Sequence, residues 1–218
     1  MKRFGIFALL LVLATAGLAQ AAEMATMREG HWDFSVQTRY TASQEFVGEG
    51  GSTLSLSDDL GWGFGLGYNV SDQFNLGFAW TWRGLNYTAM GVDGDTPADT
   101  FRYSNWLDTS TIMATGEYSL MRSKFSPYVN GALGWTFIDT NIVSDYDTGC
   151  WWDPWYGYIC ADYYDTYGTE AFVYSLGAGM RMELSPTVFV RIGYEHGWMD
   201  LQSYDGADMF RVDLGSLF

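Results

Sequence analysis

The segment Phe210-Arg211-Val212-Asp213-Leu214-Gly215-Ser216-Leu217-Phe218 alternates between two kinds of side chain. One face carries Phe210, Val212, Leu214, Ser216 and Phe218, and the other carries Arg211, Asp213, Gly215 and Leu217. A repeat of two residues is typical of a β-strand, because successive side chains of a strand point to opposite faces of its sheet. Charges on one face and bulky apolar groups on the other indicate that this strand separates two different environments.

The beginning of the chain has the pattern of a secretory signal peptide. Lys2 and Arg3 precede an apolar run over residues 4–18, and the small-residue site Ala19-Gln20-Ala21 follows. This arrangement is typical of a cleaved export signal, and the run is short for a membrane-spanning helix. We predict a signal peptide over residues 1–22, cleaved after residue 21 or 22, and one domain over residues 23–218.

The composition narrows the class of protein. Aromatic residues make up 18% of the chain, and it contains 26 Gly but only 4 Pro. Aromatic residues and glycine in alternating runs favour an all-β membrane barrel. The net charge is −15, and Lys124 would be the only lysine left after cleavage. Such a chain lacks the cations needed to neutralise phosphates, which argues against a nucleic-acid partner.

Eight segments alternate in the manner of the C-terminal one. They are residues 31–40, 60–69, 73–82, 109–120, 126–138, 171–183, 187–199 and 210–218. Most reach the ~9–11 residues that a tilted strand needs to cross a bilayer. The sequence therefore predicts eight membrane-crossing strands.

The connections between these segments alternate in length. Short turns are expected at residues 70–72, 121–125 and 184–186, and long loops at residues 41–59, 83–108, 139–170 and 200–208. Short periplasmic turns and long extracellular loops are typical of outer-membrane barrels. We predict an all-β fold, an eight-stranded antiparallel up-and-down transmembrane β-barrel. The alternative is a secreted, soluble β-sandwich or lipocalin-like barrel with the apolar face as its core, but the glycine-rich opposite face better suits a crowded lumen.

Two stretches carry a family resemblance. They are Leu60-Gly61-Trp62-Gly63-Phe64-Gly65-Leu66-Gly67-Tyr68-Asn69 and Phe125-Ser126-Pro127-Tyr128-Val129-Asn130-Gly131-Ala132-Leu133-Gly134-Trp135. In these the chain resembles the small outer-membrane β-barrels, which include the transmembrane domain of outer membrane protein A and the opacity-type adhesins. The resemblance implies a place in the cell outer membrane and recognition of the strand ending at Phe218 by the barrel assembly machinery. It implies little about function, because this fold hosts adhesins, structural anchors, small pores and lipid-modifying enzymes.

Charged residues on the inward faces of the predicted strands are expected to meet in the lumen. An eight-stranded barrel has an interior just wide enough for side chains to fill. The inward set is Asp33, Arg39, Glu117, Arg181, Glu183, Arg191, Glu195, Arg211 and Asp213. We expect a charge-paired polar plug. A narrow, gated ion pathway is the alternative, and no nucleophile accompanies these groups to favour catalysis.

The two histidines are weak candidates for catalysis. Lipid A-modifying barrels use a histidine with a nearby serine and a carboxylate. His31 begins the first segment, and His196 lies on the predicted lipid face with Trp198 where the deacylase pattern has serine. The cysteines and histidines form no metal-binding pattern. We therefore predict no enzymatic activity, no catalytic residue and no cofactor or metal centre.

The long loop over residues 139–170 is the most distinctive surface in the sequence. Cys150 and Cys160 are separated by nine residues, and in an exported protein this spacing predicts a disulfide within the loop. The predicted contact surface on this ring consists of Trp151, Trp152, Trp155, Tyr156 and Tyr158. Amphipathic rings of this kind form binding surfaces. The loop either contacts a glycan, lipopolysaccharide or host surface, or forms a rigid hairpin on the membrane interface or over the barrel.

The long loops are also rich in aspartate, which should repel the phosphates of lipopolysaccharide. We expect divalent cations to bridge the two diffusely, since no twelve-residue calcium loop is present. The sequence favours a monomeric surface protein, structural or adhesin-like, whose partners are outer-membrane lipid, lipopolysaccharide and an extracellular ligand or host surface. A narrow, porin-like ion channel and a lipid A-modifying enzyme are the alternatives.

Overall fold

The computed structural model describes residues 27–47, 52–92, 100–153, 157–200 and 206–218. The signal peptide predicted over residues 1–22 lies outside these ranges. The described part of the chain contains no helix with the length and hydropathy of a membrane span.

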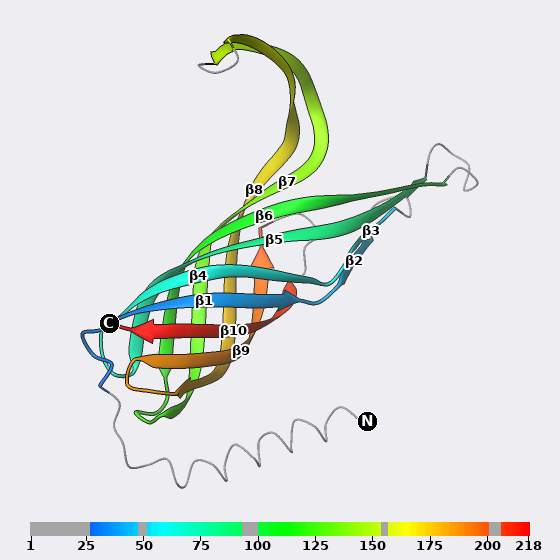
Figure 1. Cartoon of the computed structure of the whole chain (residues 1–218). Helices are drawn as coiled ribbons and strands as arrows, with labels where there is room; N and C mark the ends of the chain where they lie inside the picture. The colour runs from blue at the N-terminus through cyan, green and yellow to red at the C-terminus, as the bar shows by residue number, and fades with distance from the viewer. Residues whose placement is uncertain (1–26, 48–51, 93–99, 154–156, 201–205) are drawn as a thin grey trace.

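Eight antiparallel strands close into a barrel (Figure 1). They are β1 (Trp32–Thr41), β4 (Asp59–Asn69), β5 (Phe74–Val92), β6 (Thr100–Ser119), β7 (Phe125–Asp153), β8 (Gly157–Glu183), β9 (Val188–Met199) and β10 (Ala207–Leu217). Each strand pairs with the next, β1 pairs with both β4 and β10, and the β5–β6 pairing completes the circle. The predicted all-β, eight-stranded fold is confirmed.

A small hairpin is added outside this circle. It consists of β2 (Gln44–Val47) and β3 (Thr53–Leu56), and β3 pairs with β5. Both strands lie within residues 41–59, where the sequence analysis expected only a loop. The hairpin lies at the end of the barrel opposite the short turns, which is the extracellular end of an outer-membrane barrel.

The alternation of inward and outward side chains predicted for residues 210–218 is present in β10. Leu214 is 57% exposed on the outer surface, whereas the neighbouring Asp213 is fully buried in the lumen. β1 has the same exposed–buried alternation, and its register places Gln37 beside Asp213 and Val36 beside Leu214. Large apolar side chains on the outside and charges on the inside reverse the usual order of a water-soluble protein, as a lipid-facing shell requires.

Two of the segments predicted as long loops are strands in the structure, so the prediction was wrong there. Residues 83–92 and 100–108 continue β5 and β6 as an antiparallel ladder, and residues 139–153 and 157–170 continue β7 and β8. The prediction ended each strand at the length of a bilayer crossing, but Thr, Tyr, Val and Ile continue beyond that point and favour extended backbone in water as well. We call residues 83–92 with 100–108 the β5–β6 arm, and residues 139–153 with 157–170 the β7–β8 arm.

The two arms separate at the rim of the barrel. The β6–β7 ladder ends at the pair Asp108 and Asp139, and beyond it the arms extend in different directions (Figure 1). Asn105 Nδ2 still donates to the Asn141 carbonyl oxygen across this divide, at 3.2 Å. The extracellular end is therefore built from paired strands that extend well past the membrane-crossing part of the barrel.

Candidate functional site

All nine charged residues predicted to face the lumen do so in the structure. Their side chains are at most 8% exposed, although each lies next to outward-facing residues in its own strand. Burial of unpaired charges at this level would be prohibitive, so each group needs a partner of opposite sign. The register of the barrel supplies these partners from strands that are distant in the sequence.

Glu117 is the centre of the network. Its carboxylate lies 3.1 Å from Arg191 Nη1, 3.8 Å from Arg181 Nη1 and 3.8 Å from Arg211 Nη2. Glu117 comes from β6, whereas its partners come from β8, β9 and β10. One carboxylate thus joins the two halves of the barrel wall across the lumen.

Two further carboxylates, Asp213 and Glu195, pair with arginines of the lumen. Asp213 Oδ2 lies 3.0 Å from Arg191 Nε and 3.2 Å from Arg211 Nε. Glu195 lies between Arg211 Nη1 at 2.6 Å and Arg39 Nη1 at 3.4 Å. Because Arg191 and Arg211 each meet more than one carboxylate, the charges form a network and not a set of separate pairs.

Arg28 is the member of this network that the sequence analysis missed. It precedes β1, so no strand alternation marked it as inward-facing. Its guanidinium pairs with Glu183 and donates to Ser119 Oγ at 2.9 Å and to the Ser123 carbonyl at 3.1 Å. The network therefore contains equal numbers of arginines and carboxylates: Arg28, Arg39, Arg181, Arg191 and Arg211 with Asp33, Glu117, Glu183, Glu195 and Asp213.

Two aromatic side chains fill the remaining space in the lumen. Phe189 is fully buried, with the Arg181 guanidinium 4.0 Å and the Arg191 guanidinium 4.9 Å from its ring centroid. Tyr128 is also buried, and its hydroxyl accepts from Arg211 Nη2 at 3.3 Å. The alternation of their strands places Tyr128 and Phe189 on the inward faces, but the predicted lumen set contained charged residues alone. Stacked against guanidinium groups, they gain cation–π contact in a low-dielectric interior.

Glycines make room for these rings. A Cβ on Gly179 would lie 2.6 Å from Tyr128 Cζ, and a Cβ on Gly215 would lie 2.7 Å from Phe189 Cε2. Both distances are shorter than a real carbon–carbon contact allows. The glycines of the inward faces are thus required by the packing of the lumen. At the level of Glu117 and Arg191 the remaining cavity is about 20 Å³, roughly the space of one water molecule.

The histidines have different surroundings. His196 Nδ1 lies 2.7 Å from Asp208 Oδ1, which also accepts from Tyr194 Oη at 2.5 Å. The His196 ring lies edge-on to Trp198 at 4.6 Å. Asp208 was missed because it comes from a different strand. Among the residues that the structure describes, His196 contacts a carboxylate but no serine or cysteine of the kind that acyl transfer uses as a nucleophile.

The predicted contact surface falls on the β7–β8 arm. Trp155 and Tyr156 lie outside the described residues, and for Trp151 and Trp152 the structure describes the backbone in β7. Tyr158 is 73% exposed. The backbone register places Cys150 directly opposite Cys160. This register is compatible with a disulfide between them, and the disulfide stays a prediction.

The base of the β7–β8 arm is fixed by Asp139. Its carboxylate accepts from the Asn141 amide at 2.9 Å and from Thr166 Oγ1 at 2.8 Å. Asn141 has a positive φ of 54°, and the β7–β8 ladder shifts register between Asp139 and Val143. A bulge of this kind bends a strand, and it lies at the beginning of the arm.

The arm base is expected to respond to acid. The Asn141 amide and the Thr166 hydroxyl hold the pKa of Asp139 below its ordinary value. The stabilisation is therefore complete above an unfolded pKa of about 3.9, and it is lost as the pH falls through the lower pKa of the folded arm. NMR titration of the Asp139 carboxyl should give a midpoint below that value, and Thr166→Val should raise it. A wild-type midpoint at or above the ordinary value would contradict this assignment.

Carboxylates also line the cleft where the arms separate. A cleft of about 510 Å³ is bordered by Asp108, Asp139 and Glu170, together with Trp82 and Phe137. Within the described ranges, no group of three or more His, Cys, Asp or Glu side chains has metal-binding geometry. The diffuse cations expected from the sequence stay a prediction.

Comparison with known proteins gives a family and a fold. The sequence model described as "Outer membrane protein beta-barrel domain" matches residues 7–218. The crystal structure of the outer membrane protein OprG from Pseudomonas aeruginosa is 10% identical, with a TM-score of 0.53, and the match covers 88% of this chain and 98% of that one. At this identity the likeness concerns the fold alone.

Two other barrels are similar over comparable lengths. Neisserial surface protein A is 14% identical, with a TM-score of 0.49, and the match covers 87% of this chain and 98% of that chain. Ail, the attachment invasion locus protein of Yersinia pestis, is 11% identical, with a TM-score of 0.46 and coverage of 87% and 99%. Among curated proteins, none matches this sequence.

Proposed function

Since this chain belongs to the outer membrane protein beta-barrel domain family, we propose that it is a surface-interaction protein that acts through its extracellular arms and not through its lumen. The observation that carries the proposal is the β7–β8 arm. Its ladder continues beyond the barrel rim to the pair Asp153 and Gly157, and it presents Tyr158 and Tyr167, which are 73% and 59% exposed.

The arm has properties that suit a contact surface. Its paired strands satisfy each other's backbone groups, so a long structure can stand in water without a core of its own. Exposed tyrosines supply large, amphipathic area with few rotatable bonds to order on binding. An extracellular ligand, a host surface glycan or lipopolysaccharide is the class of partner that this position and chemistry favour.

Binding should depend on the β7–β8 arm more than on the β5–β6 arm. Tyr158→Ser removes an exposed ring from the first, and Tyr103→Ser removes a 42% exposed ring from the second. We expect the first variant to weaken binding to a glycan or lipopolysaccharide panel about tenfold, as loss of an aromatic hot spot does, and the second to bind normally. Folded protein in lipid vesicles is the sample, and circular dichroism checks the barrel.

A second pair of variants tests whether the arm must be ordered. Cys150→Ser combined with Cys160→Ser would release a ring whose closure is worth roughly 2–3 kcal/mol of chain entropy. This double variant should keep the barrel and bind less well. Equal binding by wild type, Tyr158→Ser and the double cysteine variant would remove the β7–β8 arm as the binding surface.

The two alternative functions give different readouts. The charge network and the rings of Tyr128 and Phe189 occupy the lumen, so we expect no steady single-channel current from the pure protein in planar bilayers. For lipid A modification, His196 pairs with Asp208 but lacks a described nucleophile, so overexpression of wild type or His196→Ala should leave the lipid A mass spectrum unchanged. Regular channel events, or new lipid A masses that depend on His196, would favour those alternatives.

A further inference from the structure

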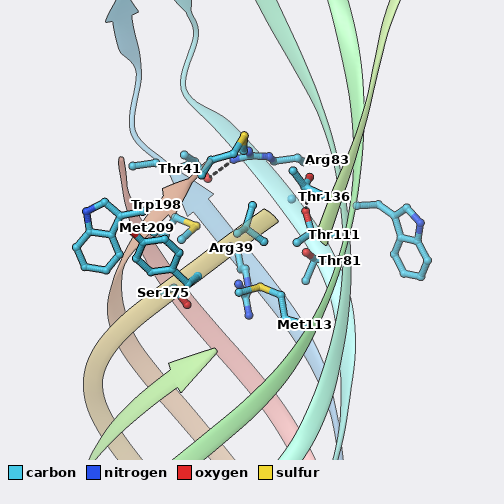
Figure 2. Close-up of a pocket in the computed structure, with 17 residues that line it drawn as sticks. Arg39, Thr41, Thr81, Arg83, Thr111, Met113, Thr136, Ser175, Trp198 and Met209 are labelled. Atoms are coloured by element: carbon cyan, nitrogen blue, oxygen red, sulfur yellow. Dashed lines mark hydrogen bonds between the residues drawn. The ribbon is translucent and has the colours of Figure 1, made fainter. Parts of the chain in front are cut away.

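A cavity lies in the extracellular half of the lumen, above the charge network (Figure 2). Its volume is about 60 Å³. Arg39 separates it from the network below, through its ion pair with Glu195. Across the top, Arg83 Nη1 donates to Thr41 Oγ1 at 3.0 Å. Thr41 and Ala207 lie at the extracellular ends of β1 and β10, so the cavity has an outer mouth and a charged floor.

The polar part of the cavity lining consists of two arginines and of hydroxyl groups from Ser175 and four threonines. The lining includes Arg39 and Arg83 but no aspartate or glutamate. Arg39 Nε and Ser175 Oγ are buried and have no hydrogen-bond partner within the described protein. The two residues are only 7% and 2% exposed. Buried donors without acceptors are costly, and two of them in one cavity point to a ligand that supplies acceptor oxygens.

The rest of the lining is apolar and adaptable. Met113, Met199, Met209 and Val173 contribute side chains from four different strands. Methionine is flexible and polarisable, so it packs well against irregular hydrocarbon groups. Here polar donors and an apolar wall border the same space.

We propose that this cavity binds a short-chain monocarboxylate. Its carboxylate accepts from Arg39 Nε–H and Ser175 Oγ–H, and its alkyl chain packs against Met113, Val173 and Met209. The volume has room for about four to six water-sized groups, which matches a molecule the size of butyrate. The network below the cavity makes this a blind site, filled from outside the cell, and it is independent of ligand binding by the arms.

The test is a titration of the folded barrel in detergent micelles with ¹³C-labelled methionine methyl groups. Butyrate should shift the Met113 and Met209 signals saturably, whereas butylamine, which has the same alkyl chain and the opposite charge, should not. Met90, which is 45% exposed on the β5–β6 arm, is the internal control. Equal effects of both compounds, no effect of either, or shifts that include Met90 would mean that the cavity holds water or partitioned solute only.

Two variants separate the head-group contact from simple filling. Ser175→Ala removes one donor without adding bulk and should weaken butyrate at least fivefold. Met113→Phe occupies the cavity and should abolish the saturable shift of Met209 while the barrel stays folded by circular dichroism. Because Arg39 belongs to the charge network, we do not rely on its replacement. Unchanged affinity in both variants would overturn the site.

Discussion

Glu195→Gln is expected to lower the free energy of unfolding by about 3–5 kcal/mol, the usual cost of removing one partner of a buried ion pair. The carboxylate lies 2.6 Å from Arg211 Nη1 and 3.4 Å from Arg39 Nη1, and it accepts from Asn130 Nδ2 at 2.7 Å. The glutamine keeps the size of the side chain and one acceptor oxygen. Its main effect is to leave two buried arginines with too little negative charge.

The measurement is urea unfolding in lipid vesicles followed by tryptophan fluorescence. Glu170→Gln is the matched control, because Glu170 is exposed at the base of the β7–β8 arm, and it should cost less than about 0.5 kcal/mol. Adding Arg39→Gln to Glu195→Gln restores the charge balance and should recover part of the loss. If Glu195→Gln is no more destabilising than the control, the lumen network does not stabilise the barrel as described.

The strand pattern was enough to predict the inward direction of nine charged residues. In a barrel strand, inward and outward positions alternate strictly, so one correctly assigned residue such as Asp213 fixes its neighbours. What the pattern could not supply is which strands bring their charges together. Glu117 meets Arg191 because of the tilt and shear of the closed sheet, and neither is encoded in a single segment.

The misses have physical causes of the same kind. Arg28 lies outside the strands, so no alternation predicts its direction. Its contacts with Ser119 and Ser123 hold its side chain in place. Tyr128 and Phe189 follow the inward alternation, but a set chosen by charge alone omits the aromatic rings that arginine guanidinium faces accept. The arms were missed because bilayer thickness limits a membrane crossing and not the length of a strand.

Gly215→Ala, a change of one methyl group in the terminal strand, is expected to destabilise the barrel by about 1–3 kcal/mol, the usual cost of overpacking. The added Cβ would lie 2.7 Å and 2.8 Å from Phe189 Cε2 and Cε1. Phe189 is fully buried, and two guanidinium groups lie against its ring. The ring therefore cannot move aside without disturbing Arg181 or Arg191.

A double-mutant cycle shows whether this ring is the cause. Phe189→Leu makes space and should remove most of the extra cost of Gly215→Ala, giving a coupling energy of about 1 kcal/mol or more. Gly116→Ala is the control, because a Cβ there would meet only Leu76 Cδ2, at 3.8 Å, among the described atoms. Additive effects in the cycle, or equal costs at Gly116 and Gly215, would show that the ring of Phe189 does not cause the destabilisation by Gly215→Ala. Coupling would instead show that the alternation in residues 210–218 specifies both the lipid-facing surface and the packing of the lumen.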